Sequence, residues 1–360
     1  MQLVYTHYMN YTGYSIAAQD YILSMLKSNV PFDIKVKWLN ADPQTGISAN
    51  RRQIFTALKN KKDALPQTNL YHSIPNLYKN IPHASKNIGF AIFETINPPK
   101  KWAEIMNNMN RIITASSFNK GVFESIGVNA PVSVVPHCFD PDLFNADVKP
   151  VGRYGMTTFY SMGTWKNRKN WETLIKAFYD AFEDKNKVCL VIKTDNPKNL
   201  QALVARVKRF SEWRTKNTAP IYADKAEHCE FEEIPKLMKK GDIYVSASLG
   251  EGFAIPVMHA MALGMPVIVP RFGGLLEYAL PQFVTYIEPA GYKEFPVMDG
   301  VPQFDNCIWP VITVDAVRDA MKKVFNDYPS EKSRMAYEYV HINLTYNIIG
   351  PKFKEAVSND

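Results

Sequence analysis

Cysteine is scarce in this chain, and its spacing excludes small proteins held together by cross-links. The 360 residues include 4 cysteines, and no two of them form a CxxC pair. A disulfide-stapled fold needs more cysteines, and a structural zinc site needs closely spaced ligand pairs. The spacing suits the reducing cytoplasm, and we expect no disulfide framework and no bound metal.

Long apolar runs are also lacking. The longest one, IPVMHAMALGMPVIVP, is broken by His259, Gly264 and prolines, whereas a spanning helix needs about 20 uninterrupted apolar residues. The opening residues, MQLVYTHYMNYTGYS, have no basic segment followed by an apolar one, as a secretory signal has. We therefore expect a cytoplasmic protein, either free or peripheral at the membrane surface.

Two common phosphate-binding motifs are missing as well. The loop after the first expected strand, NYTGYSIAAQDYI, contains no GxGxxG, and no Walker A sequence occurs. The first absence argues against a dinucleotide site of the usual Rossmann type, and the second argues against a P-loop. If the chain binds phosphate groups, other loops must hold them.

The composition that remains is that of a globular protein with more than one core. Hydrophobic residues make up 46% of the chain and charged residues 21%, which excludes disordered and collagen-like classes. A single core stops growing at roughly 250–300 residues, so two domains are expected.

Strands alternate with helices in two successive series, which predicts two α/β domains with doubly wound parallel sheets. A stretch rich in Pro, Gly and Asp separates them, so the domain boundary is expected near residue 150. In the second series we expect a helix from about Leu275 and a long irregular loop over 289–310. Helical stretches near 314–327 and 331–358 close the chain.

The positive charge is concentrated in the first third of the chain. The whole sequence has 42 basic and 35 acidic residues, a net charge of +7. Residues 1–120 hold 14 basic and 6 acidic side chains, or +8, which leaves 28 and 29, or −1, for residues 121–360. The surplus is either a set of solvated helix faces or a surface for an anionic partner.

Polar residues follow several expected strands, where doubly wound sheets bind ligands. SASLGEGFAIPVMHAMALG carries Glu251 between glycines, and MGTWKNRKNWETLIKAF carries Arg168 and Lys169 just before a helix. VPRFGGLLEYAL opens with Gly273 and Gly274, which allow a ligand to approach the backbone. These loops suit a diphosphate and a neutral polyol. A solvent-exposed glutamate and a solvent-exposed basic turn are the alternative interpretations of the same residues.

Taken together, these segments resemble the retaining GT-B-fold glycosyltransferases of the family-4 type (glycosyl transferases group 1). The segments that carry the resemblance are Thr12–Ser15, ASSFNKGVFESIGVNAPVSVVPHCFDPDLF, MGTWKNRKNWETLIKAF and DIYVSASLGEGFAIPVMHAMALGMPVIVPRFGGLLE. The resemblance implies two Rossmann-like domains facing a central cleft. The N-terminal domain (1–150) binds the acceptor, the C-terminal domain (151–344) binds the donor, and a final helix (about 345–360) crosses back to the N-terminal domain.

The same resemblance assigns an activity and a set of residues. It implies a metal-independent, retaining hexosyl- or pentosyltransferase that needs no cofactor besides its donor, a UDP-, GDP- or ADP-sugar. Lys169 and Arg168 would hold the donor diphosphate, Glu251 would bind hydroxyls of the donor sugar, and His137 would orient the acceptor or the reacting sugar, unless it is a structural histidine. The remaining implied donor contacts are Gly13, Gly163, Gly252, Phe253, Ala254, His259, Gly273, Gly274 and Leu275.

Three positions depart from the family pattern. His259 stands where relatives carry a second glutamate eight residues after the first, and imidazole cannot act as a charged bidentate acceptor. Thr164 follows Gly163 where relatives have arginine, and Cys138 replaces a glycine. These departures leave open a GT-B-fold nucleotide-sugar epimerase or a catalytically silent nucleotide-sugar-binding protein.

The predicted partners are a nucleotide sugar and an anionic acceptor. Because the N-terminal domain of such folds meets the acceptor, the basic surplus would lie on the acceptor side. Two acceptor classes fit: a lipid-linked or cell-surface glycan at a membrane, and a hydroxymethylated DNA base of the phage type.

Overall fold

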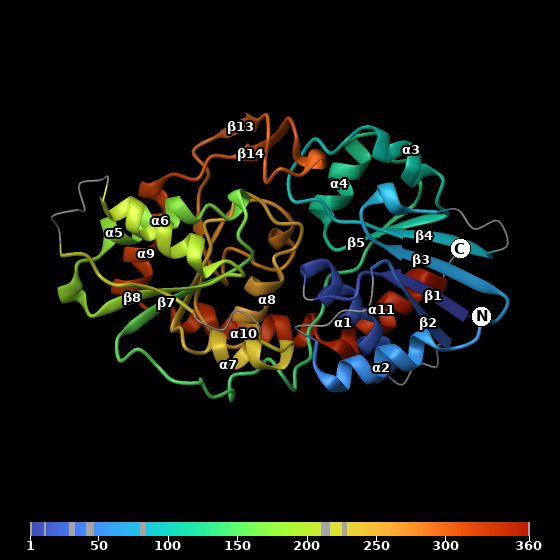
Figure 1. Ribbon diagram of the computed structural model, residues 1–360, viewed down its shortest axis with the longest axis horizontal. Helices are drawn as coiled ribbons and strands as arrows, with labels where there is room; N and C mark the ends of the chain where they lie inside the picture. Colours follow the sequence, from blue (N-terminus) through green and yellow to red (C-terminus); the bar gives the residue numbers. More distant parts are fainter. Residues whose placement is uncertain are drawn as a thin grey trace. The chain divides into compact units, whose positions relative to one another are not determined.

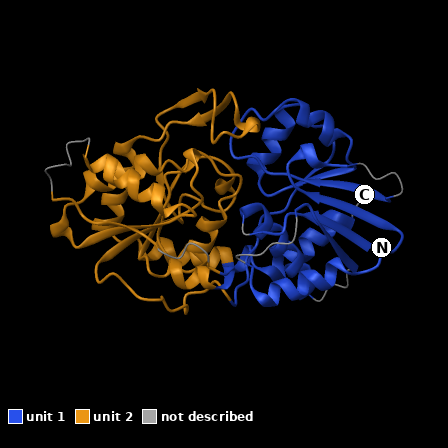
Figure 2. Ribbon diagram, viewed as in Figure 1, with its two compact units in different colours: residues 1–142, 230–232, 341–360 blue, residues 143–229, 233–340 orange. Residues whose placement is uncertain are grey.

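The computed structural model describes residues 2–10, 12–28, 33–40, 47–79, 84–209, 217–224 and 229–358. The chain divides into two compact units (Figure 2). Unit 1 comprises Met1–Asp142, Glu230–Glu232 and His341–Asp360, and unit 2 comprises Leu143–Cys229 and Glu233–Val340. The predicted α/β class with two doubly wound sheets is confirmed, because each unit contains a six-stranded parallel sheet.

The sheet of unit 1 has the strand order β2-β1-β3-β4-β5-β6. Parallel sheets are covered on both faces, and all six residues of the interior strand β1 are buried accordingly. In register, His7 at the end of β1 pairs with Trp38 on one side and with His72 on the other. The strands are β1 (Gln2–His7), β2 (Asp33–Trp38), β3 (Gln67–His72), β4 (Lys86–Phe90), β5 (Arg111–Thr114) and β6 (Val132–Val134).

Helices cover both faces of this sheet, with α1, α2 and α11 on one face and α3 and α4 on the other (Figure 1). The C-terminal helix α11 packs against α1, where the rings of Tyr21 and Phe353 stack with centroids 4.3 Å apart. The predicted return of the last helix to the N-terminal domain is therefore observed. The helices are α1 (Gly13–Lys27), α2 (Ala49–Lys59), α3 (Lys101–Asn107), α4 (Ser117–Ser125) and α11 (Tyr346–Ser358), with a 3₁₀ turn η1 (Pro75–Leu77).

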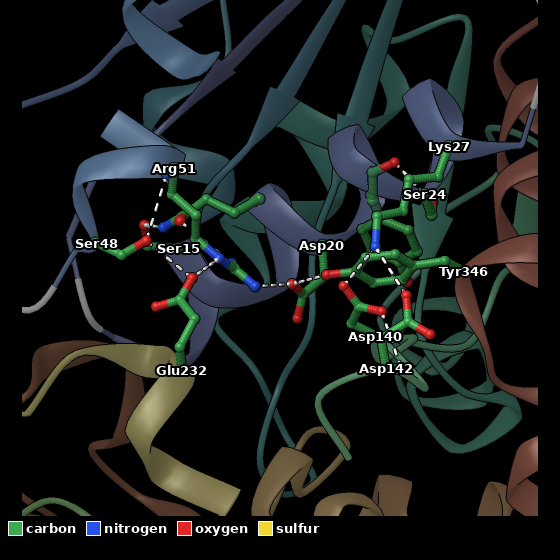
Figure 3. A network of polar contacts seen from close by, with 12 residues as sticks. Ser15, Asp20, Ser24, Lys27, Ser48, Arg51, Asp140, Asp142, Glu232 and Tyr346 are labelled. Atoms are coloured by element: carbon green, nitrogen blue, oxygen red, sulfur yellow. Dashed lines mark hydrogen bonds and ion pairs between the residues drawn. The ribbon is translucent and has the colours of Figure 1, made fainter. Parts of the chain in front are cut away.

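A buried ion pair joins three distant segments of unit 1 (Figure 3). Arg51 of α2 lies 3.1 Å from Asp20 of α1 and 3.2 Å from Glu232. The Tyr346 hydroxyl of α11 donates to the same Asp20 carboxylate. Arg51, which the basic surplus of the sequence includes, is thus a buried structural cation of unit 1 and does not contribute to an exposed basic surface.

The sheet of unit 2 has the strand order β12-β11-β10-β7-β8-β9. Its central strand β7 (TTFYSM) and its neighbour β8 (VCLVIK) are rich in apolar residues, as strands buried on both faces require. The strands are β7 (Thr157–Met162), β8 (Val188–Lys193), β9 (Ile221–Ala223), β10 (Ile243–Val245), β11 (Val267–Pro270) and β12 (Thr285–Ile287).

The helices of unit 2 are connected by several short 3₁₀ turns. Asn170, which has a left-handed backbone (φ 56°), separates one such turn from α5. The helices are α5 (Trp171–Ala181), α6 (Pro197–Arg209), α7 (Ile234–Met238), α8 (Ile255–Ala262), α9 (Val314–Asn326) and α10 (Ser330–Asn343), the last of which continues into unit 1. The turns of unit 2 are η2 (Asn167–Lys169), η3 (Asp184–Asn186), η6 (Gly274–Glu277) and η7 (Pro302–Phe304). The turn η5 (Phe231–Glu233) belongs to unit 1 except for its last residue.

Two predictions for the later part of unit 2 are wrong. The helix expected from about Leu275 is the single 3₁₀ turn η6. The loop expected over 289–310 contains an antiparallel hairpin, β13 (Tyr292–Phe295) and β14 (Cys307–Pro310). The hairpin was missed because its strands are short and a long connection separates them, although the Asp-Gly pair within that connection is a turn signal.

Among the described residues, no helix is long and apolar enough to cross a bilayer.

Candidate active site

The strand order of unit 2 places a switch point between β7 and β10, where ligands of doubly wound sheets bind. The chain leaves β7 at Met162 toward β8 on one side, and it leaves β10 at Val245 toward β11 on the other. The loops after these two strands therefore diverge from a common edge. They are the loops that carry Lys169, Arg168 and Glu251.

Lys169 ends the 3₁₀ turn η2 and reaches back across the first of these loops. Its aliphatic stem covers Gly163, where an added Cβ would lie 3.2 Å from Lys169 Cε. Its ammonium group forms an ion pair with Oε1 of Glu251 and donates a hydrogen bond to it. A Cβ at residue 163 would crowd the lysine stem, and glycine leaves it room to lie there.

Arg168 ties the two loops together through both its backbone and its side chain. Its Nη1 donates to the carbonyl of Gly250 at 3.2 Å and lies 3.4 Å from Oε2 of Glu251. Its carbonyl accepts the amide of Leu249 at 2.7 Å and the hydroxyl of Ser248 at 3.2 Å. The cationic loop and the Glu251 loop therefore form one connected structure.

A third loop, after β11, closes on Glu251 from another direction. The amide of Gly274 donates to the Glu251 carbonyl at 2.8 Å. Gly273 has φ 89° and ψ −165°, and an added Cβ would lie 2.7 Å from the same carbonyl oxygen. Only glycine fits both the dihedral angles and the contact. Gly273 and Gly274 thus hold the Glu251 backbone in place.

The electrostatics of Glu251 depend on its two cationic partners. Burial by itself would raise the pKa of this carboxyl, but the Lys169 ammonium and the Arg168 guanidinium outweigh burial and hold the pKa below its ordinary value. Glu251 is therefore ionised at neutral pH, and it accepts hydrogen bonds without donating any.

The start of α8 completes the loop that follows Glu251. Ala254 adopts a left-handed backbone (φ 66°) just before the helix. The Tyr278 hydroxyl contacts the carbonyls of Phe253 and Ala254 at 3.0 and 2.7 Å, and the Phe253 and Tyr278 rings are 4.7 Å apart. Gly252, Phe253, Ala254 and Leu275 are buried beside the three loops. The implied donor contacts of unit 2 thus lie in one connected region.

His259 lies within α8 and is buried. Its imidazole stacks on the ring of Phe144 with centroids 3.8 Å apart and planes inclined by 17°. A glutamate could not form this flat aromatic stack. The histidine that departs from the family pattern at residue 259 therefore packs against a residue of unit 2.

Sequence reasoning missed Asp299, which lies in the connection between β13 and β14. Its Oδ1 accepts the backbone amide of Arg168 at 3.2 Å, and its Oδ2 lies 3.4 Å from Arg168 Nε. The Asp-Gly turn signal could have located the turn, but no sequence pattern pairs it with a residue 131 positions away.

Comparisons with known proteins match the part of the chain that forms this site. Residues 157–287, which contain all three loops of the site, match the family described as glycosyl transferases group 1. Over this segment, called the group 1 region below, the chain is similar to the group 1 glycosyltransferases.

Relatives and solved structures extend the likeness to the whole chain. Over 241 residues, 66% of this chain and 51% of the relative, it is 22% identical to a phosphatidylinositol N-acetylglucosaminyltransferase subunit of Arabidopsis thaliana. The chain thus spans about half the length of this curated relative. Its fold is similar to that of Anabaena HepE in complex with UDP and glucose (TM-score 0.71, 12% identity, 100% of both chains). It is also similar to WaaG, a glycosyltransferase involved in lipopolysaccharide biosynthesis (TM-score 0.63, 12% identity, 99% of this chain and 100% of that chain).

Two predicted site residues lie outside the group 1 region, in unit 1. Gly13 is the first residue of α1, and an added Cβ there would meet nothing within 4 Å. His137 is buried, with Nδ1 3.0 Å from the Tyr21 hydroxyl, which itself donates to the Val135 carbonyl. Because that hydroxyl proton is already engaged, Nδ1 of His137 must carry the hydrogen that joins the two side chains.

Burial determines the charge of the unit 1 histidines. It lowers the pKa of His137 to about 3 and that of His7 to about 4, and it lowers the pKa of His72 as well. All three imidazoles are therefore neutral at physiological pH.

In the part of the chain that the structure describes, no group of three or more His, Cys, Asp or Glu side chains is arranged to hold a metal ion. The groups at the site that suit a diphosphate are Lys169, Arg168 and backbone amides.

Proposed function

We propose that the protein is a metal-independent, retaining glycosyltransferase that transfers a sugar from a nucleotide-diphospho-sugar to an acceptor hydroxyl. The observation that carries the proposal is the joining of Lys169, Arg168 and Glu251 at the switch point of unit 2. Two cations suit the diphosphate of a donor, and an ionised carboxylate suits the hydroxyls of its sugar.

The ion pairs indicate how donor binding proceeds. Without ligand, Glu251 shares both cations. A diphosphate brings two or more negative charges and competes for Lys169 and Arg168, which turns the Glu251 oxygens toward neutral hydroxyl donors. The three side chains thus change partners when the donor binds, and the low exposure of the site strengthens each new contact.

The same cations would promote the chemical step. The bond between the anomeric carbon and the diphosphate oxygen breaks, and the acceptor oxygen bonds to that carbon on the face that the diphosphate leaves. The proton of the acceptor hydroxyl passes to the departing diphosphate oxygen. Negative charge accumulates on the departing diphosphate, where Lys169 and Arg168 stabilise it in a largely water-excluded site. No bound metal is needed for this role.

UDP is the first nucleotide to test, because the similar HepE structures contain UDP, UDP with glucose, or UDP-glucose. For the acceptor, a lipid-linked molecule is favoured by the names of the curated relatives, which are phosphatidylinositol N-acetylglucosaminyltransferase subunits. The exposed lysines of unit 1, which include Lys62, Lys79, Lys100 and Lys101, suit an anionic surface.

The test compares Lys169→Ala with Lys166→Ala in a donor-hydrolysis assay over UDP-, GDP- and ADP-sugars. Lys166 is an exposed lysine three residues away and serves as the matched control. We expect Lys169→Ala to lower kcat/KM by about 100-fold or more, the cost of removing one charge-stabilising donor, and Lys166→Ala to change little. A wild-type protein that neither binds nor turns over any donor would refute the proposal. Interconversion of free donors without transfer would indicate an epimerase.

A further inference from the structure

We propose that Asp299 is a positioning residue that fixes Arg168 for the donor diphosphate, an inference that rests on the proposed function. Asp299 lies after Ile287, the last residue of the group 1 region, in the connection between β13 and β14. Its side chain is 1% exposed and forms an ion pair with Arg168. No role was assigned to it from the sequence.

The contact holds both the backbone and the side chain of Arg168. One carboxylate oxygen accepts the Arg168 amide at 3.2 Å, and the other lies 3.4 Å from Nε. On a different edge of the guanidinium, Nη1 contacts Gly250 and Glu251. A planar guanidinium held on two edges by groups from two loops has one orientation, whereas a single ion pair would leave it free to rotate.

The hairpin is built to hold Asp299 in place. Asp299 and Gly300 both have left-handed backbones, with φ 61° and 64°. Such a backbone is unfavourable for a residue other than glycine, so surrounding contacts must maintain it at Asp299. One such contact spans both residues: the Val301 amide donates to the carbonyl of the buried Met298 at 3.2 Å.

The charge balance shows why a second carboxylate is useful here. Lys169 and Arg168 bring two positive charges, and Glu251 and Asp299 bring two negative ones. If Glu251 turns to the donor sugar, Arg168 loses one of its two carboxylate partners. Asp299 still holds the Nε edge and the backbone, so the guanidinium keeps its place while the diphosphate binds.

The first test measures UDP binding by calorimetry for the wild type, Asp299→Ala, Asp299→Asn and the control Asp305→Ala, an exposed residue of the same hairpin. We expect Asp299→Ala to weaken UDP binding about tenfold and Asp305→Ala to leave it unchanged. Asp299→Asn keeps an acceptor for the Arg168 amide but loses the charge, so its UDP affinity should lie between those of the wild type and Asp299→Ala. In an Arg168→Ala background, Asp299→Ala should weaken UDP binding less than it does alone, because only the contact with the backbone amide of residue 168 is left to lose.

The inference would be overturned if Asp299→Ala left the UDP affinity unchanged. It would also be overturned if Asp299→Ala lowered the UDP affinity equally with and without the Arg168 side chain. A merely structural role of Asp299 would give the second result, because damage to the hairpin would not depend on the arginine. If Asp299→Ala does not fold, the asparagine variant decides the question by the same comparison in the two backgrounds.

A second measurement needs no nucleotide. Hydrogen exchange over residues 164–172 of the ligand-free protein should be about tenfold faster in Asp299→Ala and unchanged in Asp305→Ala, because the Arg168 amide loses its acceptor. Unchanged exchange would overturn the inference. Wild-type protein that binds no nucleotide diphosphate would instead refute the proposed function, and the exchange data would still decide whether Asp299 holds Arg168.

Discussion

At the scale of single residues, the site depends on how closely its backbone segments approach one another. Gly273 and the Glu251 carbonyl are so close that a methyl group would lie 2.7 Å from the oxygen. Gly163 lies beneath the stem of Lys169, where the contact is looser: an added methyl group would lie 3.2 Å from the flexible lysine chain. The ionisable groups are thus fixed by glycines that carry no chemistry themselves.

We expect Gly273→Ala to destabilise unit 2 by about 3 kcal/mol and to weaken UDP binding. Both the dihedral angles and the contact with Glu251 exclude a Cβ. Gly152→Ala is the control, since Gly152 of unit 2 is also left-handed (φ 87°) but an added Cβ meets nothing within 4 Å. Thermal unfolding and calorimetry check the pair. Equal effects of the two substitutions would show that the contact with Glu251 is unimportant.

His7 allows a prediction about pH. Its pKa is lowered by burial from 6.5 to about 4, so between these values the unfolded chain binds a proton that the folded chain does not. The stability that neutral His7 provides is full above about pH 6.5 and is lost as the pH falls toward 4. At about pH 5 the loss from this residue is about 2 kcal/mol.

His7→Asn tests this because an asparagine amide can replace Nδ1–H as the donor to the Tyr8 carbonyl but does not titrate. Urea unfolding at about pH 7 and about pH 5 should show a smaller drop for the variant than for the wild type. An identical drop in both proteins would contradict the prediction.

At the scale of elements, α11 contributes directly to the core of unit 1. The Phe353 ring is fully buried, stacks on Tyr21 and lies 6.0 Å from the ring of Tyr5 in the interior strand β1. A helix from the last residues of the chain thus covers the sheet formed by the first ones. Unit 1 cannot complete its core until residues 346–358 have been made.

Phe353→Ala should therefore destabilise unit 1 by about 3–5 kcal/mol, the usual cost of emptying a buried aromatic position. Ile348→Ala serves as the control on the same helix, because that side chain is 37% exposed. Its cost should stay below about 1 kcal/mol. Chemical unfolding followed by circular dichroism measures both, and a small effect at Phe353 would mean that α11 is dispensable.

At the scale of the whole molecule, the two units differ in how their charge is used. In unit 2, Lys169 and Arg168 are paired with carboxylates inside the site. In unit 1, Arg51 is buried in an ion pair, and the basic side chains on the surface include Lys62, Lys79, Lys100 and Lys101. Salt should therefore affect the two units differently, because it screens exposed charges most.

We expect binding to anionic phospholipid vesicles to weaken with salt, and UDP binding to change much less. Reversing Lys100 and Lys101 together to glutamate should lower vesicle affinity by at least about 20-fold, at roughly 1 kcal/mol for each basic residue. The matched control reverses Lys198 and Lys208, two exposed lysines on α6 of unit 2. Equal losses in both variants would indicate that net charge, and not the surface of unit 1, drives binding. If the variant with Lys100 and Lys101 reversed keeps its vesicle binding, and the wild type binds DNA with an affinity that falls with salt, the nucleic-acid acceptor is favoured.

The sequence alone was enough to predict the two parallel-sheet domains and the three loops that hold Lys169, Arg168, Glu251 and Gly273. Strand–helix alternation and glycine placement are local patterns, and they indicate which residues come directly after each strand. The pairing of Arg168 with Asp299, the burial of Arg51 and the stacking of His259 on Phe144 were decided only by the tertiary structure. Each joins side chains that are far apart in the chain, and the partner of a charge or a ring is set by packing in three dimensions, which no local pattern encodes.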